Sequence, residues 1–194
     1  IYYRIQMLRA AIDMGNTTSK IALYENNTEI RIERGLSVAR LKRFIQTYMP
    51  EQLIICSVTR TSEQLSEIFS ACKEKIIFSA NTPIPIRNDY GTPQTLGYDR
   101  LAAAVGAATL FPNENVLLID MGTAIKYDFV SADGAFKGGI ISPGMKIRFR
   151  ALHTFTKKLP LLEADGIPPL VGNTTKSCIQ SGVVNGIVAE LNGI

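Results

Sequence analysis

The chain has 194 residues, of which 46% are hydrophobic and 20% are charged, and this composition excludes a disordered or fibrous protein. Its three cysteines, Cys56, Cys72 and Cys178, are widely spaced and have no histidine ligands nearby, which argues against a disulfide framework or a zinc site. The net charge of +4 is modest and scattered along the chain, which fits simple solubility, a surface that attracts anionic metabolites, or weak nonspecific affinity for nucleic acid. As partners we expect neither nucleic acid nor a membrane. Residues 1–6 contain no signal peptide or membrane-span pattern, and we expect a cytoplasmic protein.

The first half of the chain alternates strands and helices in the manner of an α/β layer. Apolar alternation predicts strands, and the stripe formed by Leu41, Phe44, Ile45 and Tyr48 predicts a helix that Pro50 ends. The predicted order is three strands, a helix, a strand, a helix and a strand, over residues 8–13, 19–24, 29–33, 37–49, 52–57, 61–72 and 75–79. These elements suffice for one mixed sheet with helices packed on it.

The same pattern restarts in the second half. A proline-containing loop over residues 81–94 leads to an Ala-rich helix over residues 98–110. Strands are then predicted over residues 115–120, 125–130 and 135–141, followed by helices over residues 146–153 and 175–191. We interpret this as a duplication of architecture, with one domain over residues 1–112 and a second over residues 113–194. Because no closing strand follows the last helix, we expect the second domain to be incomplete at its C-terminal end; the alternative is a second sheet that is smaller than the first.

The most informative motif is Asp13-Met14-Gly15-Asn16-Thr17, which stands at the end of the first predicted strand. A carboxylate, a glycine and hydroxyl side chains at a sharp turn suit a phosphate and its metal ion. Asp13 could hold Mg²⁺ and Lys20 could neutralise phosphate oxygens. The alternative is an ordinary hairpin with a local side-chain turn.

A related motif, Asp120-Met121-Gly122-Thr123-Ala124, ends a strand in the second half and makes the phosphate interpretation stronger. Asp120 and Thr123 have the same capacity for contacts with a cation and a phosphate. Lys126 and Asp128, which alternate with apolar residues, are interpreted as charges on a sheet face. The Gly138-Gly139 and Pro143-Gly144 pairs mark close backbone approach to a ligand or simple turns.

Residues Gly97-Tyr98-Asp99-Arg100 open the Ala-rich helix. Asp99 could be a capping or first-turn residue that interacts with the helix dipole. It could instead be a catalytic base that takes a proton from a hydroxyl, with Arg100 binding an anion.

Together these motifs resemble the type III pantothenate kinase family. The resemblance includes Tyr90 upstream of Leu96-Gly97-x-Asp99-Arg100, Gly138-Gly139 with Ser142-Pro143-Gly144, and Gly172-Asn173-Thr174-Thr175 through Ser181-Gly182, in this order over nearly the whole chain. It implies two ribonuclease H-like domains of the acetate and sugar kinase, Hsp70 and actin superfamily, with ATP in the cleft between them. It also implies that ATP phosphorylates pantothenate on its primary hydroxyl, the first step toward coenzyme A.

The resemblance also assigns roles to residues. The residues expected to hold the ATP phosphates and Mg²⁺ are Asp13, Met14, Gly15, Asn16, Thr17, Thr18, Ser19 and Lys20, with Thr123 opposite them. Asp120 would be the ligand of a monovalent cation, K⁺ or NH₄⁺, and Asp99 would be the proton acceptor. The residues expected to form the pantothenate pocket are Tyr90, Gly97, Tyr98, Asp99, Arg100 and Thr175. Family members are dimers in which both subunits shape this pocket.

The chain departs from the family pattern in one respect, and two other functions are possible. Family chains continue for several dozen residues past the point that corresponds to Ile194. A noncatalytic, nucleotide-binding transcriptional regulator of the same fold is the alternative function, and the joint presence of Asp13, Asp99, Arg100 and Asp120 argues against it. A kinase of this fold that acts on another hydroxyl compound is a third possibility, because fold alone does not define a substrate.

Overall fold

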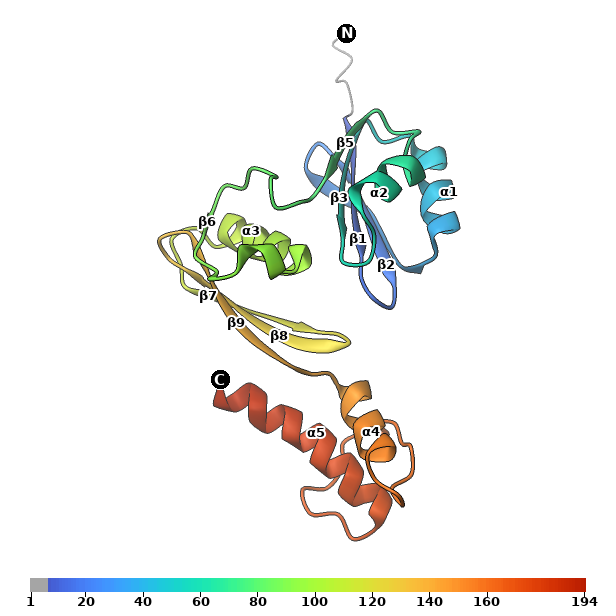
Figure 1. Ribbon diagram of the computed structural model, residues 1–194, viewed down its shortest axis with the longest axis vertical. Helices are drawn as coiled ribbons and strands as arrows, with labels where there is room; N and C mark the ends of the chain where they lie inside the picture. The colour runs from blue at the N-terminus through green and yellow to red at the C-terminus, as the bar shows by residue number, and fades with distance from the viewer. Residues whose placement is uncertain (1–6) are drawn as a thin grey trace. The chain divides into compact units, whose positions relative to one another are not determined.

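A computed structural model describes residues 7–194, so the expectation for residues 1–6 lies outside the described part. The chain divides into two compact units (Figure 1). The first contains the residues up to Val116 together with Phe129–Gly138, and the second contains Leu117–Asp128 together with Gly139–Ile194. No helix in the described residues has the length and apolar character needed to cross a membrane.

A five-stranded mixed sheet forms the centre of the first unit. Its strands are β1 (Leu8–Met14), β2 (Ser19–Glu25), β3 (Thr28–Leu36), β4 (Gln52–Ser57) and β5 (Glu74–Ile77). They lie in the order β3-β2-β1-β4-β5, with β2 antiparallel to both β1 and β3 and with β4 parallel to both β1 and β5. The mixed sheet and its element order are those that the sequence pattern predicted, and they agree with the ribonuclease H-like domain that the family resemblance implies.

Two helices cover one face of this sheet. Helix α1 (Val38–Tyr48) begins after Ser37, whose side chain accepts a hydrogen bond from the Arg40 amide. Helix α2 (Ser62–Ile68) begins with a capping box formed by Thr61 and Gln64. Alternate residues of β1, β2 and β4 pack against both helices, because successive side chains of a strand point to opposite faces. The buried residues of this core are Ala10, Ile12, Met14, Ile21, Leu23, Leu36, Leu41, Phe44, Ile45, Leu53, Ile55, Leu65, Phe69 and Cys72.

The predicted helix over residues 61–72 was too long at its C-terminal end. Helix α2 ends at Ile68, with Phe69 as its C-cap, although Phe69 and Cys72 are both buried. The apolar spacing therefore continues through a turn, where the Phe69 and Cys72 side chains still reach the core. Local periodicity could not distinguish this turn from another turn of helix.

The segment predicted as a loop between β5 and the Ala-rich helix contains regular structure. Strand β6 (Arg87–Asn88) pairs in parallel with the start of β9 (Ala135–Pro143), so that Asn88 lies opposite Phe136. A short 3-10 helix, η1 (Pro93–Thr95), precedes α3 (Tyr98–Leu110). The sequence pattern missed β6 because its partner is far away in the chain and supplies the hydrogen bonds that define it.

The second sheet repeats the first three strands of the first one. Its order is β6-β9-β8-β7, with β7 (Val116–Met121) and β8 (Ala124–Ser131), so β9-β8-β7 corresponds to β3-β2-β1. In the second unit, α4 (Met145–Thr154) and α5 (Thr175–Gly193) pack against each other and cover Ile125 and Tyr127 of β8. The predicted duplication of architecture is therefore confirmed for this three-strand element. The predicted domain boundary near residue 112 stays a prediction.

Candidate active site

The first predicted phosphate turn joins β1 to β2. The Gly15 amide donates to the Thr18 carbonyl at 3.2 Å, which closes the turn. Asn16, Thr17 and Thr18 are exposed at its tip, whereas Met14 and Ser19 are buried beneath it. Any direct contact between the turn and a phosphate therefore involves the tip and the residues that flank it. The expected nucleotide contacts of Met14 and Ser19 stay predictions.

Asp13 and Lys20 form an ion pair at the base of this turn. They face each other across the antiparallel β1-β2 ladder, with 3.6 Å between Lys20 Nζ and Asp13 Oδ2. Both side chains are about half exposed, at 44% for Asp13 and 50% for Lys20. The pair can therefore rearrange around a bound phosphate and metal ion at little cost.

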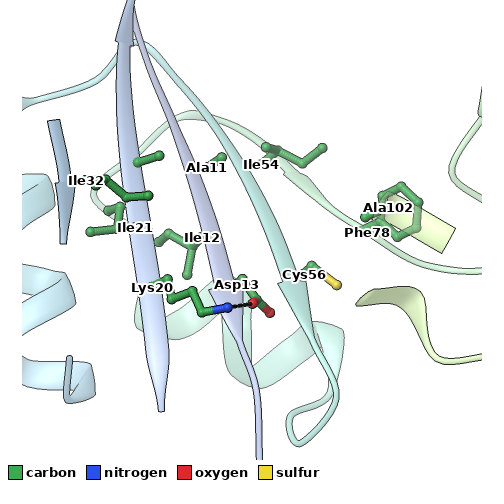
Figure 2. Close-up of a pocket in the computed structure, with 11 residues that line it drawn as sticks. Ala11, Ile12, Asp13, Lys20, Ile21, Ile32, Ile54, Cys56, Phe78 and Ala102 are labelled. Carbon is green, nitrogen blue, oxygen red and sulfur yellow. Dashed lines mark ion pairs between the residues drawn. The ribbon is translucent and has the colours of Figure 1, made fainter. Parts of the chain in front are cut away.

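An apolar pocket of about 280 Å³ extends from this ion pair along the sheet face opposite the α1-α2 core. Figure 2 shows Asp13 and Lys20 with their ion pair among side chains that are otherwise apolar or a thiol. Ala102 from α3 and Phe78 contribute to the pocket lining. Its charged lining residues are confined to this pair, so the rest of the pocket offers no charge to a phosphate.

The second predicted turn joins β7 to β8 and resembles the first in its chemistry. The Gly122 amide donates to the Ala124 carbonyl at 3.0 Å, and Thr123 is exposed. Asp120 pairs with Lys126, with 2.7 Å between Lys126 Nζ and Asp120 Oδ2. Each turn thus has an aspartate on the first strand paired with a lysine on the second. Lys126 was predicted as a charge on the sheet face, and the structure assigns it this partner.

The N-terminus of α3 carries the candidate catalytic residues. Gly97 is the N-cap, and Asp99 lies in the first turn, where the helix dipole favours a carboxylate. Asp99 Oδ1 lies 2.6 Å from the position that a Cβ on Gly97 would take, so the carboxylate folds back over the start of the helix. Tyr98 packs edge-on against Phe78, with 6.1 Å between ring centroids. Gly97, Tyr98 and Asp99 are all partly exposed, so this region is open to a ligand.

Arg100 and Tyr90, which are distant in the sequence motif, meet in the structure. The Arg100 guanidinium lies 5.4 Å from the centre of the Tyr90 ring and 5.8 Å from that of Phe136. The two rings are stacked, with centroids 6.0 Å apart and an interplanar angle of 27°. Arg100 is only 5% exposed, and Phe136 is fully buried. The predicted pair is thus supported by Phe136, a residue that the sequence analysis did not single out.

Hydrogen bonds around Asn88 and Asp89 hold Tyr90 beside β9. The Tyr90 amide donates to Asn88 Oδ1, and the Asp89 amide donates to the Phe136 carbonyl. Gly138 has φ of +92°, and a Cβ there would lie 3.1 Å from the Tyr90 ring. Gly138 therefore leaves the space that Tyr90 occupies. Phe136 could have been found only by knowing that β6 pairs with β9.

Exposed ion pairs reinforce this attachment of β6 to β9. Asp89 accepts hydrogen bonds from Arg87 and Lys137, and these cations hold the pKa of its carboxyl at about 2. Arg87 also pairs with Asp133 at 2.9 Å. Because these side chains are largely exposed, each pair contributes little on its own.

Thr175 lies in the second unit, where it is the first residue of α5. A capping box between Thr174 and Ser177 begins the helix. The α5 start lines a shallow cavity of about 650 Å³ together with Leu152 and Leu159 of the α4 region. Thr175 is exposed. Its expected contact with pantothenate stays a prediction.

Within residues 7–194, no cluster of three or more acidic, histidine or cysteine side chains could hold a metal ion by protein ligands alone. A Mg²⁺ ion that arrives with a nucleotide keeps several waters and takes only one or two protein carboxylates beside the phosphates. The half-exposed Asp13 carboxylate beside the predicted phosphate turn could supply one such ligand.

Comparison with known proteins gives a consistent result. The family model for type III pantothenate kinase matches residues 10–194. A type III pantothenate kinase from Phocaeicola vulgatus is 43% identical over 185 residues, which cover 94% of this chain and 76% of that protein. One from Azobacteroides pseudotrichonymphae is 44% identical over 183 residues, which cover 93% of this chain and 75% of that protein.

A solved structure supports the fold. The crystal structure of a conserved protein from Campylobacter jejuni, described as a Baf family transcriptional activator, matches with a TM-score of 0.56. It covers 95% of this chain and 78% of that chain at 20% sequence identity, so it is evidence for the fold alone. The family model and the kinase relatives identify the family: this chain belongs to the type III pantothenate kinases.

Proposed function

We propose that this chain transfers the γ-phosphoryl group of ATP to the primary hydroxyl of pantothenate, giving 4'-phosphopantothenate in the first step of coenzyme A synthesis. The observation that carries the proposal is the family match over residues 10–194, which includes every candidate site residue from Asp13 to Thr175. The alternative of a noncatalytic regulator is not favoured, because relatives about 40% identical are named as kinases. We also propose that the enzyme works in the cytoplasm.

Asp99 is the proposed proton acceptor. A primary alcohol is a weak nucleophile, so a carboxylate within hydrogen-bond reach both orients it and takes its proton. As the hydroxyl oxygen bonds to the γ-phosphorus, the bond from that phosphorus to the bridging oxygen of ADP breaks and the proton passes to Asp99. The partly exposed position of Asp99 in the first turn of α3 suits this role.

The β1-β2 turn is the proposed site for the ATP phosphates. The exposed tip of the turn offers amide and hydroxyl donors, and Lys20 offers a positive charge that can leave Asp13 for the phosphate oxygens. Asp13 is the proposed ligand of Mg²⁺. When bound, this ion neutralises charge on the phosphates. Thr123 of the second turn is a further proposed nucleotide contact.

The acceptor pocket is proposed to form around Tyr90 and Arg100. The guanidinium, fixed against two aromatic rings, suits the carboxylate of pantothenate, and Gly97 and Tyr98 supply the adjoining surface. Thr175 of α5 is a further proposed contact with pantothenate. We propose a homodimer in which both subunits contribute, as the sequence resemblance implies.

A monovalent cation, K⁺ or NH₄⁺, is proposed to bind Asp120. The Lys126 ammonium group is 2.7 Å from the same carboxylate. An alkylammonium group resembles NH₄⁺ in charge and hydrogen bonding, so Lys126 competes with a free cation for Asp120. The cation requirement of this chain therefore depends on Lys126 as well as on Asp120.

The decisive experiment follows ADP release with pantothenate in wild type and Asp99→Asn. We expect turnover in the wild type and a fall of kcat by about 10²- to 10⁴-fold in the variant, because a general base is lost. Binding of a nonhydrolysable ATP analogue should be unchanged. Asp165→Asn, which removes an exposed carboxylate paired with Lys176, is the matched control and should keep wild-type turnover. Near-normal turnover in Asp99→Asn would refute the role of Asp99, and an inactive wild type would refute the function.

A further inference from the structure

Glu190 lies near the end of α5 and joins four elements of the second unit. Its Oε1 accepts a hydrogen bond from the Tyr127 hydroxyl of β8 at 2.8 Å. Its Oε2 accepts from the Ser142 hydroxyl of β9 at 3.0 Å and from the Arg148 guanidinium of α4. One carboxylate is thus satisfied by three donors on three different elements, an arrangement that fixes its position.

Arg148 also binds the segment that contains Ser142. Its Nε donates to the Pro143 carbonyl at 2.7 Å, and its terminal nitrogen donates to the Ser142 hydroxyl at 2.7 Å. Arg148 and Glu190 therefore both bind Ser142, and Arg148 also binds the following residue. Their side chains are only 19% and 25% exposed, so solvent screens this ion pair less than it screens a surface pair.

Gly144, which follows Ser142 and Pro143, packs against the Gly122-Thr123 turn. The Gly144 amide donates to the Thr123 carbonyl at 3.1 Å. A Cβ on Gly144 would lie 2.3 Å from the Thr123 carbonyl oxygen and 2.4 Å from that of Gly122, so no side chain fits between the two segments. The position of Ser142–Gly144 therefore determines where the Gly122-Thr123 turn can lie.

From these contacts we infer that Glu190, through its ion pair with Arg148, is a positioning residue that holds the Gly122-Thr123 turn in place for the nucleotide. The inference rests on the proposed function in taking that turn as a nucleotide contact. Glu190 acts through Ser142, Pro143 and Gly144 and has no contact with the turn in the described hydrogen bonds. Glu190 is 15 residues from Thr175 on the same helix, or about 22 Å. We therefore expect a change at Glu190 to affect the proposed nucleotide contact at Thr123 and not the proposed pantothenate contact at Thr175.

Glu190 remains charged, so its ion pair with Arg148 persists over a wide pH range. The hydrogen bonds from Arg148, Ser142 and Tyr127 hold the pKa of the Glu190 carboxyl at about 2. Glu190 therefore stays ionised throughout the physiological pH range, and the ion pair does not act as a pH switch.

The test compares Glu190→Gln with wild type by steady-state kinetics and by hydrogen exchange. Glu190→Gln keeps the side-chain size and removes the charge. We expect the KM for ATP to rise about tenfold, because a charge-assisted hydrogen bond is lost, while the KM for pantothenate stays within about twofold. Amide exchange should become faster in residues 120–124 and 142–146 and stay unchanged in the first unit.

Two further variants make the test specific. Arg148→Met should raise the KM for ATP at least as much as Glu190→Gln, because it also removes the hydrogen bonds to Ser142 and Pro143. The double variant should lose no more than Arg148→Met alone, because the two residues act as a pair. Asp165→Asn, in the exposed Asp165-Lys176 ion pair of the same unit, should change neither KM value. If Glu190→Gln does not fold, Ser142→Ala removes only one of its three donors and should show a smaller rise in the KM for ATP.

The outcomes distinguish a failure of the positioning role of Glu190 from a failure of the proposed kinase function. Equal rises in both KM values, or an exchange increase spread over the whole second unit, would overturn the positioning role and leave Glu190 as a general stabiliser. A wild type that does not phosphorylate pantothenate would overturn the proposed function. In that case the exchange in residues 120–124, together with the affinity for a nonhydrolysable ATP analogue, would still decide the role of Glu190.

Discussion

Each of the two phosphate turns contains one aspartate and one lysine on adjacent strands. The pair is looser in the first turn, at 3.6 Å for Asp13-Lys20, than in the second, at 2.7 Å for Asp120-Lys126. Lys126 is also more enclosed, with 18% of its side chain exposed against 50% for Lys20. The first lysine is therefore free to follow a phosphate, whereas the second is held near its carboxylate.

Together with the proposed cation site at Asp120, this difference predicts a response to potassium. Lys126→Met keeps the aliphatic stem but removes the ammonium group proposed to compete for Asp120. We expect the KCl concentration for half-maximal activity to fall about two- to fivefold, the size of a partly exposed ion pair. The measurement is turnover against KCl, with choline chloride holding the ionic strength constant.

The control for this prediction is Lys137→Met, which removes an ammonium group from Asp89 in the first unit. Its potassium response should match that of wild type. A potassium requirement that is unchanged or higher in Lys126→Met would contradict competition at Asp120. A response of both variants alike would indicate a general effect of charge.

Among single residues, the sequence indicated the candidate carboxylates better than their partners. Asp13, Asp99 and Asp120 stood out because each follows a strand or opens a helix beside a glycine. Lys126 and Phe136 did not, because the contacts of a strand residue depend on the side chains of the neighbouring strand. Their roles depend on which side chains face them across β7-β8 and β6-β9, and single-sequence periodicity does not contain that information.

The segment before Tyr90 is held by strand β6, which pairs with β9 through only two residues, Arg87 and Asn88. Strand β6 is held by its ladder with β9 and by exposed ion pairs, and the Tyr90 ring fits only because Gly138 has no side chain. A small substitution on β9 should therefore displace the Tyr90 ring.

Gly138→Ala tests this dependence. The new methyl group would lie 3.1 Å from the Tyr90 ring, so the ring must shift by a few tenths of an ångström, which disturbs its contact with Arg100. We expect the KM for pantothenate to rise about two- to tenfold, the value of a cation-π contact, with the KM for ATP unchanged. Steady-state kinetics with each substrate varied in turn gives both constants.

Gly134→Ala is a matched control. Gly134 also has positive φ, at +73°, but a Cβ there meets nothing within 4 Å. Both variants should lose about 1–2 kcal/mol of stability through backbone strain, and only Gly138→Ala should change the KM for pantothenate. The same rise in both variants would show that strain, and not the Tyr90 ring, is responsible.

At the level of elements, strongly periodic segments were predicted well. Helix α1 and strands β1, β2 and β4 follow their predicted ranges closely, because burial against one core determines both pattern and structure. Strand β6 and the end of α2 were missed for opposite reasons. The first owes its structure to a remote partner, and the second buries apolar side chains without continuing the helix.

At the scale of the whole molecule, the repeated three-strand element gives each half of the chain one turn with the same chemistry. The β1-β2 and β7-β8 turns both follow the first strand of that repeat. The duplication could be predicted because it recurs in the sequence as Asp-Met-Gly followed by polar or small residues. Whether both turns serve one nucleotide, as the family resemblance implies, stays a prediction.

The stoichiometry of nucleotide binding tests that prediction. Calorimetric titration of the whole chain with a nonhydrolysable ATP analogue should give one site per chain. Lys20→Met should weaken this site about tenfold or more through loss of a charged contact, and Thr123→Val about two- to tenfold through loss of a neutral hydrogen bond. Two sites per chain, with each variant losing a different one, would mean that the turns bind separate nucleotides. With one shared nucleotide the stoichiometry stays at one in both variants, and the double variant loses the sum of the two binding free energies, because the turns contact different groups of the same ligand.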